Sequence, residues 1–243
     1  RAAELHDEAL FKQPPPRDEC PICMLTLPLS GSEQRFQACC GKVLCNGCIY
    51  AASVADRRCL CPFCRTPSAS SDGELIKWME KRAKSNDANA IYELGCCYQN
   101  GRCGLPQDPN KAAELWLQAG ELGYGAAYGI IAAAYGNGEG VAEMNMKKVK
   151  HYLELGAMEG DVTARHNLGA MEWNAGNMNR AMKHWIISAA AGSDNSLNEI
   201  REGYMNGHVT RAGFEKALRA HKDANDETKN DQRDAAAAFH GQN

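Results

Sequence analysis

Four segments of the chain repeat one pattern of small and apolar positions. They begin 37, 37 and 32 residues apart, at Ala90, Ala127, Ala164 and Ser196. Four residues into each segment comes a larger apolar residue, which is Leu94, Ile131, Leu168 or Ile200. Steps of four residues place side chains on one stripe of an α-helix. The pattern therefore predicts four helices, each with one stripe facing a core.

A second set of helical segments lies between these four and begins at Lys111, Lys147, Asn179 and Phe214. Asp108 and Pro109 stand where an N-cap and a first turn are expected for the first of them. Large aromatic residues recur at one position, as Trp78, Trp116, Tyr152 and Trp185, and we expect them to serve packing. Repeats of 20–50 residues are typical of helical solenoids. We predict an all-α solenoid of helix-turn-helix repeats over residues 74–225.

The preceding region differs in composition. Nine of the twelve cysteines lie between Cys20 and Cys64, whereas the rest of the chain is rich in alanine and glycine. This shift predicts two domains. Residues 68–73 are polar, with serine and glycine, and read as the linker between them.

The cysteines occur in pairs. Three Cys-x-x-Cys pairs and the adjacent Cys39 and Cys40 give eight thiols, enough for two tetrahedral zinc ions. A disulfide framework is the alternative, and it requires an oxidising compartment and is typical of small secreted domains. The paired spacing favours zinc.

The order and spacing of these pairs resemble a RING finger, a domain in which two zinc ions are bound in an interleaved cross-brace. The resemblance covers residues 18–67 and implies a small α+β fold. Carried onto this chain, it implies two sets of ligands. The first zinc would be held by Cys20, Cys23, Cys45 and Cys48, and the second by Cys39, Cys40, Cys61 and Cys64.

Lys42 stands where RING fingers often have a metal-binding histidine. A protonated lysine has no lone pair for a metal, so Cys39 is expected to supply that ligand. RING relatives with an adjacent Cys-Cys-Gly are similar in this respect. A competing assignment uses Cys59 in place of Cys39.

The RING resemblance implies ubiquitin ligase activity, in which the domain docks a ubiquitin-conjugating enzyme that carries ubiquitin. Ile22 and Pro62 match the family's apolar contact for that enzyme, and Arg65 matches a basic residue that bridges enzyme and ubiquitin. Each of them also has a purely structural interpretation: Ile22 could pack within the zinc loops, Pro62 could shape a turn, and Arg65 could be a solvated charge. The tryptophan that many active RING fingers carry before the seventh ligand is missing here.

The helical segments resemble Sel-1-like repeats, relatives of tetratricopeptide repeats, with alanine and glycine at contact positions and a Leu-Gly pair in the first helix. This resemblance implies protein scaffolding or substrate recruitment. Trp173 lies outside the repeated pattern, beside Glu172 and in a shortened repeat. It is a candidate recognition anchor, with local repacking as the alternative.

The net charge of -3 offers no broad basic field, so we expect protein partners and no nucleic acid. No apolar run approaches the length of a membrane span, and the first residues lack the apolar core of a signal peptide. Reduced thiols favour a cytoplasmic or nuclear location. The first residue is Arg1 instead of methionine, as expected of a fragment that lacks a targeting segment.

We therefore predict a helical N-terminal flank at 1–17, the RING domain, the repeats, and a C-terminal cap or disordered tail at 226–243. The predicted function is a RING-type ubiquitin ligase whose partners are a conjugating enzyme, ubiquitin, and a substrate or adaptor protein. A non-catalytic, zinc-stabilised scaffold is the alternative.

Overall fold

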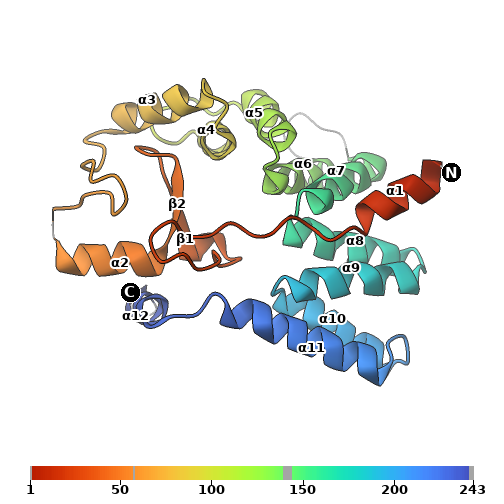
Figure 1. Cartoon of the computed structure of the whole chain (residues 1–243). Coiled ribbons are helices and arrows are strands. Elements are labelled where there is room, and N and C mark those ends of the chain that lie inside the picture. Colours follow the sequence, from red (N-terminus) through yellow and green to blue (C-terminus); the bar gives the residue numbers. More distant parts are fainter. Residues whose placement is uncertain (1, 57, 139–143, 241–243) are drawn as a thin grey trace. The chain divides into compact units, whose positions relative to one another are not determined.

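The computed structural model describes residues 2–56, 58–138 and 144–240. This part of the chain contains twelve α-helices and one two-stranded sheet (Figure 1), which confirms a mostly helical protein with a small sheet near its start. Internal contacts divide the chain into two compact units. The first unit is Arg1–Pro16 with Gly123–Asp226, and the second is Arg17–Leu122 with Glu227–Asn243. The boundaries of these units differ from those of the domains predicted from the sequence, and the predicted domains stay a prediction.

The cysteine-rich region of the second unit is built on a short hairpin. Strands β1 (Gln34–Gln37) and β2 (Lys42–Cys45) are antiparallel and follow a 3-10 turn, η1 (Gly31–Glu33). Helix α2 (Asn46–Ala55) begins directly after β2. The buried core of this region is small and consists of three cysteines and two leucines: Cys20, Leu27, Leu44, Cys45 and Cys48. Because so little apolar surface is buried, bound metal would add much of the stability.

Three further helices of the second unit follow a polar stretch. They are α3 (Asp72–Ala83), α4 (Ala88–Asn100) and α5 (Pro109–Glu121). Helix α3 begins inside the segment predicted as a linker, with Ser71 as its N-cap. Asp108 accepts a hydrogen bond from the backbone N–H of Lys111 at 3.0 Å, which confirms the predicted cap of α5.

The C-terminal residues form helix α12 (Asp231–His240), which packs against α2 in the same unit (Figure 1). The rings of Tyr50 and Phe239 lie 5.2 Å apart in this contact. A Cβ atom at Gly47 would lie only 2.7 Å from the backbone nitrogen of Arg233. Glycine at position 47 therefore lets the two helices approach closely.

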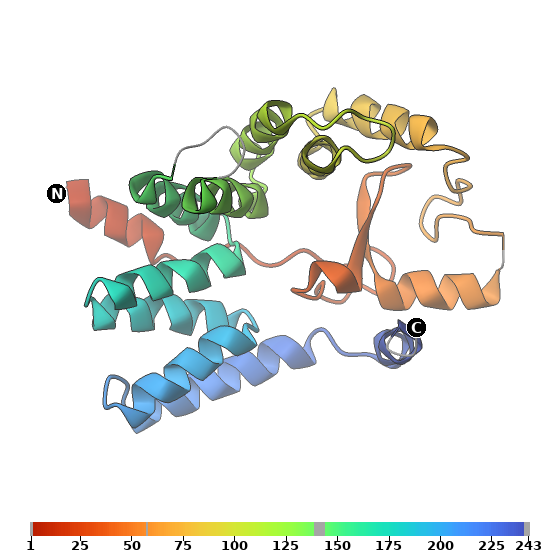
Figure 2. The ribbon, with the colours of Figure 1, turned by 180° about the vertical axis from the view of Figure 1, so that it is seen from behind.

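The first unit contains helix α1 (Ala2–Leu10) and three stacked pairs of antiparallel helices, visible from behind in Figure 2. Neighbouring pairs also contact each other, as helix-turn-helix repeats do. The pairs are α6 (Gly125–Asn137) with α7 (Met146–Met158), α8 (Val162–Asn174) with α9 (Met178–Ala190), and α10 (Asp194–Met205) with α11 (Arg211–Asp226).

The predicted apolar stripes are buried. Leu94, Ile131, Leu168 and Ile200 are all 5% exposed or less. Trp116 and Trp185 are buried too, and each covers a glycine of the preceding helix. A Cβ atom at Gly95 or Gly169 would lie 2.6 or 2.3 Å from the indole nitrogen. The Leu-Gly pair thus leaves room for the tryptophan of the second helix.

Within the described ranges, we find no helix whose length and apolar character would let it cross a bilayer.

Candidate metal centre

Eight cysteines of the second unit gather into two compact groups. The first cysteine group is Cys20, Cys23, Cys45 and Cys48, and the second cysteine group is Cys39, Cys40, Cys61 and Cys64. Within each group all Sγ atoms lie within 4.8 Å of one another. These are the same two sets that the RING resemblance implied, and they alternate along the chain.

The sulfur spacing fits a tetrahedral metal ion. Cys23 and Cys45 have their Sγ atoms 3.8 Å apart, as do Cys40 and Cys61. Sulfurs at the corners of a tetrahedron with metal bonds of about 2.3 Å would be about 3.8 Å apart. Both groups can therefore hold a metal ion such as zinc with little rearrangement.

Two tight turns of equal geometry supply half of the thiols. In the first turn, the backbone N–H of Met24 donates to the carbonyl of Cys20 at 2.8 Å. In the second, the N–H of Arg65 donates to the carbonyl of Cys61 at 2.9 Å. Met24 and Arg65 both adopt the left-handed conformation, with φ of 58° and 61°. Each turn aims two Sγ atoms at one point.

The turn between β1 and β2 carries Cys39 and Cys40. Gly41 has φ of 71°, a conformation that favours glycine, and its N–H bonds back to Gln37 at 2.7 Å. Lys42 is exposed and takes no part in either group. Cys59 also lies outside both groups, so the structure brings Cys39, and not Cys59, to the second cysteine group.

An arginine from α3 braces the second cysteine group. Arg82 donates from Nε to the carbonyl of Ala38 at 2.6 Å and from a terminal nitrogen to that of Cys39 at 2.7 Å. Its guanidinium also lies 3.7 Å from Asp87. These bonds hold the turn that carries two thiols of the group.

A second arginine, from α12, braces the first cysteine group. Arg233 donates to the carbonyl of Thr26 at 2.7 Å, and its other terminal nitrogen lies 3.4 Å from the Sγ of Cys23. A guanidinium beside a thiolate stabilises negative charge on the sulfur. Sequence reasoning did not find Arg82 or Arg233, because no local pattern connects them with cysteines far away in the chain.

Burial and local hydrogen bonds shift the pKa values of two thiols of the second cysteine group in opposite directions. Burial, together with neighbouring sulfurs, raises the pKa of Cys40 to about 11. For Cys64, burial acts against ionisation, but hydrogen bonds with Thr66 outweigh it and lower the pKa to about 6. Several thiolates cannot share so small a volume without a positive charge among them. A divalent cation would supply that charge.

The three residues predicted to dock a conjugating enzyme lie on the two cysteine turns. Ile22 is 41% exposed on the first turn. Pro62 is half-buried and Arg65 exposed on the second. Phe63, at the position equivalent to Ile22, is 44% exposed. Both turns thus present apolar side chains to solvent beside their thiols, and the first turn also exposes Met24.

Trp173, the predicted recognition anchor, lies in the first unit and is half-buried. Its ring lies 5.7 Å from that of Trp185 and 5.4 Å from that of His208, between the repeats' own side chains. Its role in recognition stays a prediction.

The remaining cysteines do not form a third metal site in the described chain. Cys97 is buried, and its Sγ lies 3.8 Å from that of Cys103, but no third ligand joins them. None of the twelve cysteines, all of which are described, is in a disulfide.

Known proteins resemble this chain in its repeats. The family model of the Sel1 repeat matches residues 88–124 and 126–161. A crystal structure of a Sel1 repeat protein from Oxalobacter formigenes aligns with a TM-score of 0.50 and 27% identity, covering 64% of this chain and 63% of that one. The two matched segments are therefore Sel1 repeats, as their pattern predicted. The matches of the family model do not extend to the cysteine groups.

Two curated relatives match parts of the chain. The ERAD-associated E3 ubiquitin-protein ligase component HRD3B of Arabidopsis thaliana is 26% identical over 117 residues, 48% of this chain and 18% of the relative. The chitin synthase regulator SKT5 of Saccharomyces cerevisiae is 30% identical over 102 residues, 40% of this chain and 14% of the relative. The chain thus matches less than a fifth of either relative's length.

Proposed function

We propose that the two cysteine groups bind zinc as a RING-type cross-brace, and that the protein is a ubiquitin ligase whose Sel1 repeats recruit a protein substrate or adaptor. The observation that carries this proposal is the pair of alternating four-cysteine groups, with sulfur spacing suited to tetrahedral zinc. When bound, zinc would cross-link loops that bury little apolar surface.

Such zinc sites would act through docking and not through metal chemistry. Four cysteine ligands close the coordination sphere, so no position is left for water or substrate. The covalent step then takes place on the conjugating enzyme. The role of this chain is to hold that enzyme and its ubiquitin, and we assign the contacts to Ile22, Pro62 and Arg65.

The side chain of Arg65 supports its assignment. The exposed guanidinium has a planar set of donors that can bond two partners at once. Met24, at the same position of the first turn, has no such capacity.

The recruiting role rests on the repeats and on the relatives. HRD3B is named as a component of a ubiquitin ligase, and SKT5 as a regulator of chitin synthase. Both names describe proteins that work with another protein, which supports an adaptor role for these repeats. The reduced thiols that zinc requires favour a cytoplasmic or nuclear location.

Ubiquitin transfer in a purified system tests the ligase proposal. We expect the zinc-loaded chain to ubiquitinate itself with at least one of a panel of conjugating enzymes. Arg65→Ala should reduce the rate at least about tenfold, because a charge-assisted hydrogen bond contributes about 1.5–3 kcal/mol. Arg58→Ala is the control, since Arg58 pairs with Asp56 on the same loop. Absence of transfer from a folded chain with two zinc ions would favour the scaffold.

Zinc retention tests the two bracing arginines. We expect Arg233→Ala to speed the loss of one zinc and Arg82→Ala to speed the loss of the other, each about tenfold. Release to a coloured chelator should show one accelerated phase in each single variant and two in the double variant. Unchanged release would show that these hydrogen bonds do not stabilise the metal sites.

A further inference from the structure

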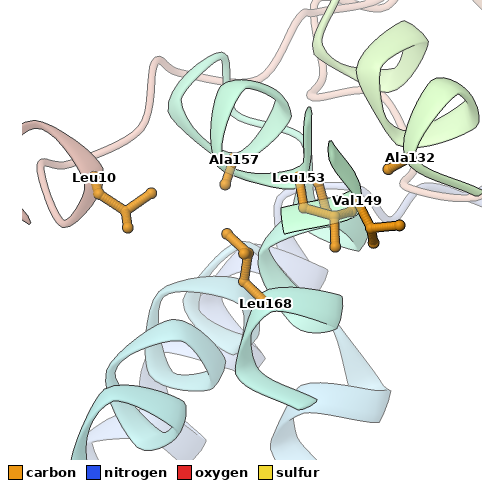
Figure 3. Close-up of a cluster of buried hydrophobic side chains, with 7 residues drawn as sticks. Leu10, Ala132, Val149, Leu153, Ala157 and Leu168 are labelled. Atoms are coloured by element: carbon orange, nitrogen blue, oxygen red, sulfur yellow. The ribbon is translucent and has the colours of Figure 1, made fainter. Parts of the chain in front are cut away.

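The N-terminal segment, residues 4–16, lies on the first unit as a ligand would. Helix α1 ends at Leu10, whose side chain is 1% exposed among apolar residues of α7 and α8 (Figure 3). The same buried cluster includes Leu153, Ala157 and Leu168. A helix of nine residues is not stable alone in water, so its order depends on the repeats.

A buried arginine of α8 holds the end of that helix. Arg165 is 2% exposed, and it donates one hydrogen bond to the carbonyl of Leu10 and another, at 2.6 Å, to that of Ala157. The last carbonyls of a helix have no partner within it and carry partial negative charge. The guanidinium of Arg165 thus recognises a helix end at this position.

A second arginine fixes an acidic residue one turn earlier. Arg180 of α9 forms an ion pair with Asp7, and this hydrogen bond lowers the pKa of Asp7. Arg180 is itself held by Glu172, whose carboxylate is 3.5 Å away and also accepts from Lys150 at 2.7 Å. The network therefore places one cation where an acidic side chain of a bound helix can reach it.

The third contact of the segment, after those of Leu10 and Asp7, is made by the aromatic ring of Phe11. The ring of Phe11 lies 4.6 Å from that of His184, which is fully buried, and neither ring nitrogen of His184 has a hydrogen-bond partner. Arg180 and Lys183 lie 5.2 and 5.4 Å from the Phe11 ring, within range of cation–π attraction. These contacts favour an aromatic side chain at this position of the segment.

The prolines that follow lie against the turn between α7 and α8. A Cβ atom at Gly160 would lie 3.1 Å from Pro15, and Gly160 has φ of 90°. Pro14 lines a small hollow beside Arg165. The opposite side of the segment is exposed, including Leu5 and Glu8. Positions 7, 10, 11, 14 and 15 of the segment make the contacts described above, and His6 adds a contact of 3.5 Å with the carboxylate of Glu154 on α7.

We propose that the surface of α7, α8 and α9 that holds this segment, the α7–α9 face, is a peptide-recognition site for a partner protein. The ligand is a short acidic helix with the pattern Asp-x-x-Leu-Phe, followed within four residues by proline. The chain's own segment shows this chemistry and occupies the face in the free protein. Anchors at i, i+3 and i+4 are the ordinary mode of helix recognition.

Charge and burial favour recognition over simple packing. Two arginines and an unpartnered histidine stabilise a contact less well than apolar side chains of similar size would. They do select against ligands that lack an acidic residue or a helix end. The inference rests on the recruiting part of the proposed function and is independent of ubiquitin transfer.

Binding of a labelled peptide to the full chain tests the proposal. The peptide has the sequence of residues 2–16. The same segment within the chain competes with the peptide for the α7–α9 face, at an effective concentration of roughly millimolar. In a chain with Asp7→Asn and Phe11→Ala, the weakened chain, the segment binds the α7–α9 face less tightly. We expect this chain to bind the peptide at least about tenfold more tightly than the parent chain does.

Matched variants show whether the contacts are the ones described. A Leu10→Ala peptide should bind at least about tenfold more weakly, and a Glu8→Gln peptide should bind as the parent peptide does. Adding Arg180→Gln to the weakened chain should reduce binding to a similar extent. If the weakened chain melts less cooperatively, the peptide should raise its melting temperature. Equal binding of all peptides, or neither binding nor thermal stabilisation, would overturn the proposal while leaving the transfer assay unaffected.

Discussion

Cys45→Ser is expected to unfold the cysteine-rich region of the zinc-loaded protein. Cys45 is fully buried, its Sγ lies 3.8 Å from that of Cys23, and it also ends strand β2. Structural zinc in small domains contributes on the order of 10 kcal/mol to folding, and little core remains without it. Hydrogen exchange should then show loss of protection across residues 18–67, with one zinc or none retained.

Cys59→Ser is the matched control, because Cys59 is exposed and lies outside both groups. We expect this variant to keep two zinc ions and the parent's hydrogen-exchange pattern. Equal damage from both substitutions would contradict the ligand sets and revive the assignment of Cys59. Treatment with a strong chelator should reproduce the effect of Cys45→Ser in the parent chain.

Gly169→Ala is expected to destabilise the first unit by about 1–3 kcal/mol, as overpacking of a close-packed core does. The added Cβ would meet the indole of Trp185 at 2.3 Å. That indole cannot easily move, because its N–H donates to the carbonyl of His166 at 3.1 Å. Urea unfolding followed by circular dichroism measures the change.

Gly136→Ala is the control in the same unit. Its Cβ would lie 3.7 Å from Val149, an ordinary contact, so alanine's helix preference should stabilise the helix by up to about 1 kcal/mol. The two substitutions are chemically identical, and their opposite signs would isolate the overlap with Trp185. Stabilisation by both would show that the tryptophan can shift.

Local patterns in the sequence predicted the helices and the clustering of thiols. The spacing of Leu94, Ile131, Leu168 and Ile200 depends only on helix geometry, and all four are buried as predicted. Paired cysteines also carry their geometry locally, since two thiols on one tight turn can point at one ion. The Sel1 character of the repeats followed from the same patterns.

Long-range contacts were not predictable in this way. Arg233 and Cys23 are separated by 210 residues, and Arg165 and Leu10 by 155. Nothing in the local sequence distinguishes either arginine from a solvated surface charge. Their importance follows only from burial and from the carbonyls and sulfur that they contact. The N-terminal segment was predicted as a helical flank, but its position on the repeats was not.

Metal content and coordination test the central claim most directly. X-ray absorption at the zinc edge and native mass spectrometry of the purified chain should give two zinc ions per chain. Each ion should have four sulfur ligands at about 2.3 Å. Fewer than two zinc ions in a folded chain, or nitrogen or oxygen in the coordination shell, would contradict the two four-cysteine centres.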